Sequence, residues 1–355
     1  MHKINRLSFI DILSRVEPGL SLKDFIEQSN CFLFEDGWCI TYNDEITCRA
    51  RTNLPESFRG AAYALPLKKT LEHMQEDEVE ISFTETELLV KERRRKVGVR
   101  IQTDIRNYAD LVDPPETWMP VTEEFIEAVK QILPTAGTDD EKFITVCVHI
   151  HPQWMETTDQ SQVTRYRIEA GNDESILVRA KSLKHILALG LVKWGVTKEW
   201  IHFKNKSLIF SCRRQIGEFP DLEHAFRIEG EKANLPKGAV DSAKLSSIFS
   251  GDDELNDRVK VSLFKEKGEM SISSQGQKGW SSSAVDLVYE GGNAEFLIDP
   301  ANLIRIIETH NECVVGEHML WVEGENWQYA TCLGSVGDGA KRPDSDPEEK
   351  GDDDG

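Results

Sequence analysis

The sequence predicts an α+β protein made of three tandem domains, each with two helices packed on antiparallel sheets. The chain has 355 residues, which is more than one hydrophobic core usually holds. Two polar segments that contain proline, at 113–120 and 228–238, divide it into pieces of about 110 residues, the usual size of a domain. A succession of strand, short helix and hairpin occurs in each piece. We therefore expect domains at 1–117, 118–228 and 229–334.

The threefold repeat is clearest at a short helix that follows an apolar, strand-like run. The matching segments are 65–74, 178–187 and 298–307, in which Pro66, Arg179 and Asp299 would be equivalent. Apolar positions in each segment lie three and four residues apart, which is typical of an amphipathic helix. A hairpin with a polar turn follows each helix. The three pairs of hairpin arms are 88–90 with 97–99, 200–203 with 208–210, and 319–322 with 328–330.

A second helix is predicted near the start of each domain, at 7–16, 122–133 and 239–249. In the first of these, four apolar residues fall on one face, namely Phe9, Ile12, Leu13 and Val16. Alternating strands follow, most clearly in the first domain, where Asp36-Gly37 and Asn43-Asp44 separate them. Each domain thus combines two helices with about eight strands.

The last segment, 335–355, has no apolar periodicity, and from Asp338 onward it holds eight acidic and three basic residues. Such a composition cannot bury enough surface to offset the entropy of the chain, so the sequence predicts a disordered acidic tail. Two interpretations remain open. The tail could simply be solvated, or it could screen or recruit a basic partner.

Composition excludes several classes of protein. No apolar run approaches 18 residues, so no membrane span is expected, and the N-terminus lacks the apolar core of a secretory signal. Seven cysteines without a Cys-x-x-Cys pair indicate reduced thiols in a cytoplasmic protein. The formal net charge is −20, which argues against a protein that grips DNA over a broad surface.

Four stretches resemble one known family. They are Gly19-Leu20-Ser21-Leu22-Lys23, Thr41-Tyr42-Asn43-Asp44-Glu45-Ile46, Glu156-Thr157-Thr158-Asp159 and Gly217-Glu218-Phe219-Pro220-Asp221-Leu222. Their order and their places within a threefold repeat resemble the bacterial-type DNA sliding clamp, the processivity factor of replicative DNA polymerase. The resemblance covers nearly all of residues 1–334. Gln160-Ser161-Gln162-Val163 departs from the Gly-His-Arg-Leu common in the family, and the chain continues past the usual end, so a divergent clamp, of a kind that a phage could encode, is expected.

The resemblance implies that each chain forms half of a closed ring, because six such domains close the ring in this family. Three domains in one chain then imply a homodimer, in which strand pairing across subunits removes free sheet edges. By position, Ile248 and Phe249 of one copy would meet Val97 and Val99 of the other. The alternative is that these four are ordinary core residues.

A ring retains DNA by topology, so a mildly basic lining is enough to attract phosphates without regard to base sequence. Screening acts over about 8–10 Å in physiological salt, so acids on the outer rim would be largely screened. Arg93, Arg94 and Arg95 form a denser cluster, but they fall in a predicted hairpin turn that could face outward. The cations expected to face DNA are Arg15, Lys23, Lys68, Lys69, Lys130, Lys181, Lys184, Lys244 and Arg305.

The resemblance also implies a partner site between the second and third domains. DNA polymerase, the clamp loader and repair proteins would dock there through short apolar-aromatic peptides. The residues carried over to this pocket are Thr158, Asp159, Val163, Pro220, Leu222, Ala225, Tyr329, Ala330, Thr331, Cys332 and Leu333.

Enzymatic functions find little support in the sequence. His149 and His151 could supply half of a metal site, but no third ligand stands at a suitable spacing. No cofactor motif or catalytic constellation is recognised. The alternatives to a clamp in the cytoplasm of a bacterium or a phage-infected host are a metal-dependent hydrolase or nuclease, and a scaffold protein that does not encircle DNA.

Overall fold

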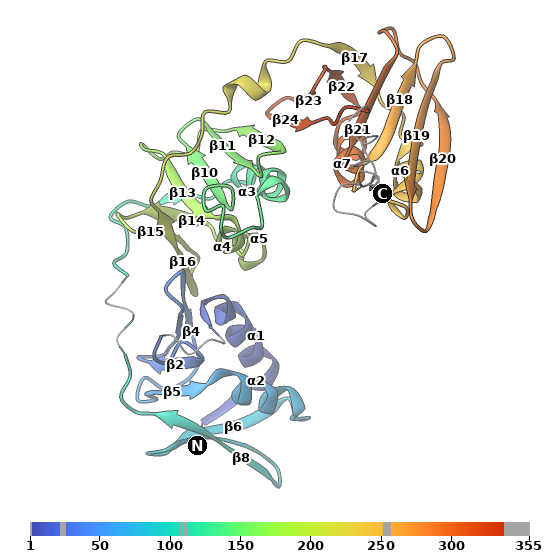
Figure 1. The fold of residues 1–355 in the computed structure, drawn as a ribbon. Coiled ribbons are helices and arrows are strands. Elements are labelled where there is room, and N and C mark those ends of the chain that lie inside the picture. Colours follow the sequence, from blue (N-terminus) through green and yellow to red (C-terminus); the bar gives the residue numbers. More distant parts are fainter. Residues whose placement is uncertain (1, 22–25, 107, 109–111, 251–256, 337–355) are drawn as a thin grey trace, which may run out of the picture. The chain divides into compact units, whose positions relative to one another are not determined.

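The structure is a computed structural model that describes residues 2–21, 26–106, 108, 112–250 and 257–336 (Figure 1). The chain forms two compact units. The first unit comprises Met1–Asp159 with Tyr166–Phe219, and the second comprises Gln160–Arg165 with Pro220–Gly355. Most of the predicted acidic tail, from residue 337 onward, lies outside the described residues.

The first half of the first unit is an antiparallel sheet with two helices. Its strands pair in the order β1-β6-β7-β8-β5-β2-β3-β4. The elements are β1 (His2–Asn5), α1 (Arg6–Val16), η1 (Glu17–Gly19), β2 (Cys31–Glu35), β3 (Trp38–Tyr42), β4 (Ile46–Arg51), β5 (Gly60–Tyr63), α2 (Ala64–His73), β6 (Glu78–Phe83), β7 (Glu87–Glu92) and β8 (Arg95–Gln102).

The second half of the first unit repeats this succession. Its strands pair in the order β9-β14-β15-β16-β13-β10-β11. The elements are β9 (Met119–Pro120), α3 (Glu123–Ile132), η3 (Leu133–Thr135), β10 (Cys147–His151), β11 (Trp154–Thr158), β12 (Gln162–Arg167, divided between the units), β13 (Ile176–Arg179), α4 (Ala180–Leu183), α5 (Ile186–Leu189), β14 (Lys193–Val196), β15 (Trp200–Lys204) and β16 (Leu208–Gln215).

The two halves are joined by strand pairing. β4 and β16 run antiparallel, from Ala50 opposite Leu208 to Ile46 opposite Cys212. The sheet therefore continues from one half into the other, and its helices lie on one side of the strands (Figure 1). Large side chains fill the core beneath the helices, among them Phe32, Phe125, Trp194, Phe203 and Phe210. Burying each such ring contributes about 1.5–3 kcal/mol.

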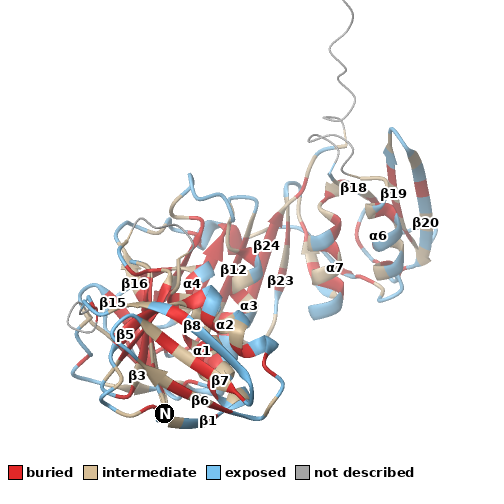
Figure 2. Ribbon diagram, turned by 90° about the horizontal axis from the view of Figure 1, so that it is seen from below, coloured by how far each residue is buried: buried red, intermediate tan, exposed pale blue. Residues whose placement is uncertain are grey.

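The helix boundaries follow from caps and apolar spacing. Asn5 caps α1, since its side chain accepts the N–H of Ser8 at 2.9 Å, and Thr122 caps α3 by accepting the N–H of Phe125 at 3.0 Å. Figure 2 shows both buried and exposed residues on the helices that can be seen in that view. The helices predicted at 7–16, 65–74 and 122–133 are confirmed within one residue at each end.

The helix predicted over 178–187 is wrong as a single element. It consists of two short helices, α4 and α5, separated at Lys184 and His185. There the N–H groups of His185, Leu187 and Ala188 bond three residues back, which tightens the chain into turns that an α-helix cannot continue through. Gly190 ends α5 in the left-handed conformation, with φ of +59°.

The second unit contains a third succession of the same kind. A sheet in the order β20-β19-β18-β21 and a ladder of β17-β22-β23-β24 carry two helices. The elements are η4 (Glu223–Phe226), β17 (Glu231–Asn234), α6 (Ala239–Ser247), β18 (Val259–Phe264), β19 (Glu269–Gly276), β20 (Gly279–Asp286), β21 (Ala294–Ile298), α7 (Pro300–Thr309), β22 (Glu312–Val315), β23 (Met319–Glu323) and β24 (Trp327–Cys332).

Serines replace apolar side chains where α6 packs on its sheet. Ser274 Oγ donates to the carbonyl of Ser246 at 2.6 Å, and Ser281 Oγ donates to Ser246 Oγ at 2.8 Å. These three serines are buried, so their mutual bonds satisfy groups that would otherwise be costly to desolvate. The helices predicted at 239–249 and 298–307 correspond to α6 and α7, and Asp299 caps α7 by accepting the N–H of Ala301.

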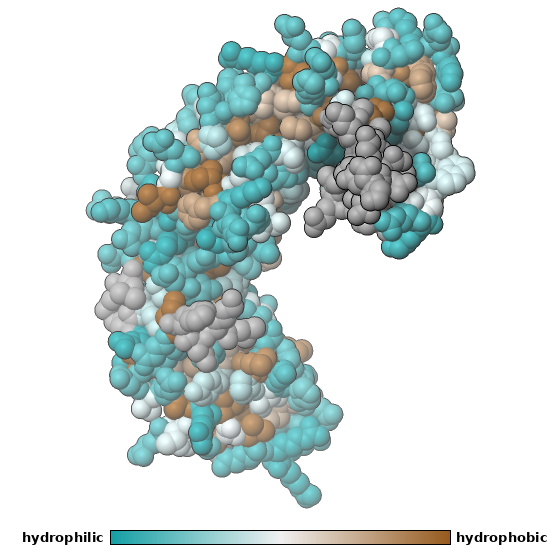
Figure 3. Space-filling view, in the orientation of Figure 1, coloured by the Kyte–Doolittle hydropathy of each residue, from teal (hydrophilic) through white to brown (hydrophobic). Residues whose placement is uncertain are grey.

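The surface agrees with the acidic, polar composition. Figure 3 shows that the visible faces of both units are mainly hydrophilic, with scattered hydrophobic areas. Among the described residues, no helix has the length and apolar character needed to cross a lipid bilayer. The boundaries of the three domains stay a prediction, because the two compact units group the first two successions together.

Candidate functional site

The cations predicted to face DNA are carried by helices. Arg15 lies on α1, Lys68 and Lys69 on α2, Lys130 on α3, Lys181 on α4, Lys184 directly after it, Lys244 on α6 and Arg305 on α7, while Lys23 falls outside the described residues. The ammonium-bearing side chains at 69, 130, 181, 184 and 244 are exposed.

Several of these cations already have carboxylate partners. Lys68 Nζ lies 2.5 Å from Glu17 and 4.0 Å from Glu72. Three further pairs are Lys130 with Glu127 at 3.6 Å, Lys181 with Glu45 at 3.5 Å, and Lys244 with Glu308 at 3.6 Å. Exposed pairs of this kind contribute about 0–1 kcal/mol, so a phosphate could displace the carboxylate at little cost.

Arg305 differs from a solvent-facing cation. Its guanidinium lies 4.9 Å above the ring of Tyr329, and Nη2 donates to Thr164 Oγ1 at 3.4 Å. Burial lowers the pKa of this guanidinium. Arg305 is thus engaged in packing within the second unit, and its contact with DNA stays a prediction.

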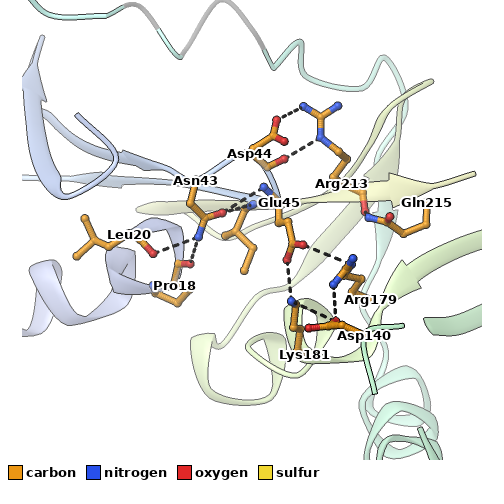
Figure 4. Close-up of polar contacts among 11 residues, drawn as sticks. Pro18, Leu20, Asn43, Asp44, Glu45, Asp140, Arg179, Lys181, Arg213 and Gln215 are labelled. Atoms are coloured by element: carbon orange, nitrogen blue, oxygen red, sulfur yellow. Dashed lines mark hydrogen bonds and ion pairs between the residues drawn. The ribbon is translucent and has the colours of Figure 1, made fainter. Parts of the chain in front are cut away.

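A polar cluster joins the two halves of the first unit beside the β4–β16 pairing (Figure 4). The cluster begins at the loop between β3 and β4. Asn43 Nδ2 donates to the carbonyls of Pro18 and Leu20, and Asn43 Oδ1 accepts the N–H of Ile46 at 2.8 Å. The loop is thus fixed, and its next two residues, Asp44 and Glu45, point at cations of the second half.

The junction cluster, defined here as Asp44, Glu45, Asp140, Arg179, Lys181 and Arg213, is balanced in charge. Arg213 Nη2 lies 2.8 Å from the Asp44 carboxylate, and its Nε donates to the Asp44 carbonyl at 2.7 Å. Arg179 lies 2.7 Å from Asp140 and 3.3 Å from Glu45. The cluster therefore holds the junction together, and it includes Lys181 from the predicted DNA-facing set.

Part of the predicted partner pocket lies in the second unit. Beside β24, the Cys332 N–H donates to the Ser161 carbonyl at 2.7 Å, and the Tyr329 hydroxyl donates to Gln162 Oε1 at 2.9 Å. Most of the residues carried over to this part are buried, while Pro220 is exposed. The buried ones are Val163, Leu222, Ala225, Tyr329, Ala330, Thr331 and Leu333.

An ion pair that sequence reasoning missed supports this part of the second unit. Arg165 Nη1 lies 2.7 Å from Glu223, and the Arg165 guanidinium lies 4.7 Å above the Phe226 ring. The hydrogen bond from Arg165 lowers the pKa of Glu223, so this carboxylate is ionised at neutral pH. The partners are 58 residues apart, and no local pattern in the sequence connects them. Thr158 and Asp159 belong to the first unit, so the complete pocket stays a prediction.

The four residues predicted to join two copies differ in how far they are exposed to solvent. Ile248 is 69% exposed and Val97 is 37% exposed, so both can meet a partner. Val99 is 3% exposed and belongs to the core of its own unit, which favours the alternative of a core residue at this position, while the contact between two copies stays a prediction. Phe249 is half-buried, and its ring packs close to Gly279 at the start of β20.

The histidines of the hypothetical metal site are engaged in other contacts. His149 Nδ1 lies 2.8 Å from Glu156, and the His149 ring is stacked on Phe219. His151 is stacked on Trp154 with 3.5 Å between ring centroids. Within the part of the chain that the structure describes, no group of three potential ligands could hold a metal ion.

No protein-family model and no curated protein sequence matches the chain. Solved structures do match. DNA polymerase III subunit beta from Pseudomonas aeruginosa has a TM-score of 0.80 at 14% identity, over 93% of this chain and 98% of that one. The beta subunit from Thermotoga maritima has a TM-score of 0.80 at 15% identity, over 94% and 99%. The DNA polymerase sliding clamp from Bacillus subtilis has a TM-score of 0.78 at 12% identity, over 94% and 98%. The chain thus has the fold of bacterial sliding clamps, although its sequence has diverged far from theirs.

Proposed function

We propose that this chain is a DNA sliding clamp, which closes as a homodimer around duplex DNA and tethers a replicative DNA polymerase. The observation that carries the proposal is the shared fold, which extends over 93–94% of the chain in comparisons with proteins named as beta subunits of DNA polymerase III or as sliding clamps. A likeness limited to one domain would support only a shared building block, whereas this likeness includes all three successions of elements.

The distribution of charge supports the same function. A protein with a net charge of −20 cannot hold DNA by a broad electrostatic grip, but a ring needs only loose contacts that allow sliding. The helix-borne lysines supply such contacts. Lys69 and Lys184 are exposed, and the structure records no carboxylate partner for either among the described residues.

Closure by a second copy would use β8 and the region around α6. β8 is a strand of the first unit whose segment from Arg95 to Arg100 pairs only with β7 among the described strands. Ile248, at the end of α6, presents an apolar side chain to solvent in the second unit. Contact with a second copy would pair the free backbone groups of the β8 edge and would remove the exposed apolar side chain from water.

Partners are expected to bind by inserting apolar side chains of a short peptide into the pocket, and no reaction is expected to take place there. Most of the pocket residues are apolar, which suits the anchoring of a Leu or Phe side chain. Polymerase, clamp loader and repair proteins would share the pocket in turn. Titration of a synthetic hexapeptide that carries Leu and Phe tests this assignment. Pro220→Ala should weaken binding several-fold, whereas Pro236→Ala in the same unit should not; equal affinities would remove the pocket.

The decisive test of the function is retention on DNA. Protein assembled on nicked circular DNA should stay bound during gel filtration in high salt and should be lost when the circle is linearised. Ile248→Asp should reduce retention, because it places a charge in the proposed subunit contact. Val288→Asp introduces the same charge at another apolar side chain, which is 85% exposed, and serves as the matched control. Equal retention on circular and linear DNA would contradict the proposal.

A further inference from the structure

A groove lies beside the end of β16, and all of its lining belongs to the first unit. We name it the β16 groove. Its volume is 1110 Å³, above the range of about 300–1,000 Å³ that is common for small-molecule pockets, so it has room for a stretch of polypeptide. None of the described residues that line it belongs to β8, to α6 or to the predicted DNA-facing set. The groove therefore uses none of the residues already proposed to contact a second copy or DNA.

The apolar part of the lining is exposed most strongly at one position. Ile216, the first residue after β16, is 96% exposed, more than any other large apolar side chain in the described part of the chain. Leu177 is buried, and Phe143 and Phe219 are half-buried. An apolar side chain of a ligand that packs against Ile216 would remove the exposed surface of both from water, which is a main source of affinity in peptide binding.

The charges of the lining are largely compensated. Arg213 and Arg214 each lie 2.8 Å from a carboxylate, which belongs to Asp44 for the first and to Glu174 for the second. Arg213 is at the same time a member of the junction cluster (Figure 4). The other fully charged side chains of the lining are one lysine and two glutamates. The groove thus concentrates no uncompensated charge of one sign, and its chemistry favours a largely neutral ligand over a phosphate or a metal ion.

The chain beyond β16 offers main-chain groups to such a ligand. β13 pairs with β16 as far as Gln215, where the ladder ends. In the described part of the chain, no backbone partner bonds to the main-chain groups of Gly217, Glu218 or Phe219, and the first two of these residues are exposed. Free main-chain groups beside an apolar groove allow a peptide to bind by strand addition, with its alternate side chains in the groove.

The groove is also held in shape without a ligand. The Phe219 ring is stacked on the His149 ring, with 4.9 Å between their centroids, and His149 Nδ1 lies 2.8 Å from the buried Glu156 carboxylate. At Gly217 the chain passes so close to Ile144 that a Cβ atom would lie 2.7 Å from its Cδ1. A groove that is already formed loses less entropy when a peptide binds.

The position of the groove along the chain indicates which peptide it would bind. Phe219 lines the groove, and the next residue, Pro220, belongs to the proposed partner pocket. A peptide anchored at Pro220 would therefore have its flanking residues close to the groove. We propose that the β16 groove binds the extended flank of a partner's anchoring peptide, through main-chain hydrogen bonds to residues 217–219 and an apolar side chain packed against Ile216. This inference rests on the proposed function, because it lengthens the peptide site from the anchoring residues to their flank.

The test compares peptides of two lengths on the full chain by fluorescence anisotropy. The short peptide is the hexapeptide that carries Leu and Phe, and two longer peptides extend it by Ser-Val-Ser-Val at one end or at the other. One of the two longer peptides should bind about tenfold tighter than the hexapeptide, because a valine is buried and main-chain bonds form. N-methylation of both added valines removes two N–H donors and should abolish most of this gain.

A variant of the chain locates the added residues of the peptide. Ile216→Ser should remove the gain from the extension and leave the affinity of the hexapeptide unchanged. Val192→Ser is the matched control, since Val192 is 55% exposed, belongs to the same unit and lies outside the lining, and it should keep the gain. Because Ile216 is almost fully exposed, its substitution should leave the fold and the retention on nicked circular DNA unchanged.

The outcomes separate this inference from the proposed function. Equal affinities of all three peptides, or a gain that survives Ile216→Ser or N-methylation, overturn the inference while the partner pocket can still hold. Loss of retention on circles in Ile216→Ser would assign this residue to a contact between copies and would also overturn it. A gain that depends on Ile216, with neither length of peptide weakened by Pro220→Ala, would support the groove and contradict the pocket.

Discussion

The junction cluster and the tip of the β7–β8 hairpin, here Arg94, Arg95 and Lys96, are both rich in cations, lie in the same unit and use these cations in opposite ways. At the junction, Arg179, Lys181 and Arg213 all have carboxylate partners within 4 Å (Figure 4). At the hairpin tip, Arg94 and Lys96 have no carboxylate partner within 4 Å among the residues that the structure describes. Paired, partly buried cations hold elements of a chain together, whereas uncompensated exposed ones are available to a ligand. The two regions should therefore respond differently to the same kind of substitution.

The largest effect is expected at Arg179. Its side chain is 17% exposed and contacts both Asp140 and Glu45, so Arg179→Met leaves these two carboxylates with the exposed Lys181 as their remaining recorded cation. The free energy of unfolding should fall by about 2–3 kcal/mol, measured by urea denaturation. Arg94→Met removes the same charge at the hairpin tip, and it should change the free energy of unfolding by less than about 0.5 kcal/mol. Similar losses in the two variants would remove the distinction between the regions.

Acid should weaken the sheet beside the junction. His202 on β15 is 1% exposed and contacts Ser211 on β16, the strand that pairs with β4. Burial lowers the pKa of His202 to about 4, below its value of about 6.5 in an unfolded chain. The unfolded chain thus binds more protons between these values, and stability falls as pH drops through that window.

The expected loss from His202 is about 2 kcal/mol between pH 7 and pH 5. Urea denaturation at both values measures it, and His202→Asn should flatten the dependence. The backbone N–H of Glu76 lowers the pKa of Glu92, and the hydrogen bond from Arg165 lowers that of Glu223, so the stability that these carboxylates contribute is lost only at more acidic pH. Burial also lowers the pKa of His185, so a smaller dependence should remain; a dependence in His202→Asn as steep as in the unchanged chain would contradict this assignment.

Lys181 belongs both to the junction cluster and to the predicted DNA-facing set. Its substitution should therefore have a small effect on stability and a small effect on DNA binding. It is 52% exposed, 3.5 Å from Glu45 and 3.7 Å from Asp140. Lys181→Met should cost about 0.5 kcal/mol of unfolding free energy, as exposed pairs do, and should lower the slope of log K against log salt for duplex binding, measured by fluorescence anisotropy, by about 0.9. A stability loss as large as that of Arg179→Met would place Lys181 entirely with the junction.

The smallest effect on stability is expected from the tip of the β7–β8 hairpin. Arg94→Ser with Lys96→Ser removes two mutually repelling charges that have no internal partner, so the unfolding free energy should stay within about 0.5 kcal/mol or rise slightly. The same urea series measures it. A clear loss of stability would mean that these cations serve the fold.

Local patterns in the sequence predicted local structure well. The stripe of Phe9, Leu13 and Val16 gives α1, and the polar turns give the hairpins, because both depend on neighbours within a few residues. The break at Lys184 and His185 was missed, since the apolar spacing across 178–187 does not reveal three-residue hydrogen bonds. The likeness of the whole fold to sliding clamps followed from the order of these elements.

The site was less accessible to sequence reasoning, because its electrostatics depend on distant partners. Asp44 and Arg213 are 169 residues apart, and Lys68 and Glu17 are 51 apart. The burial of Val99 and the packing of Arg305 on Tyr329 depend in the same way on tertiary contacts. The run Arg93-Arg94-Arg95-Lys96 was visible in the sequence, but the partners of Arg93 and Arg95, Glu76 and Glu92, could be assigned only from the structure.

The central claim is that two copies of this chain close around DNA, and the mass and image of the particle test it most directly. Sedimentation equilibrium, combined with electron microscopy of the same sample, should give twice the 40.3 kDa mass of one chain and an annular particle. A mass of one chain at every concentration, with no annular particle, would contradict the account.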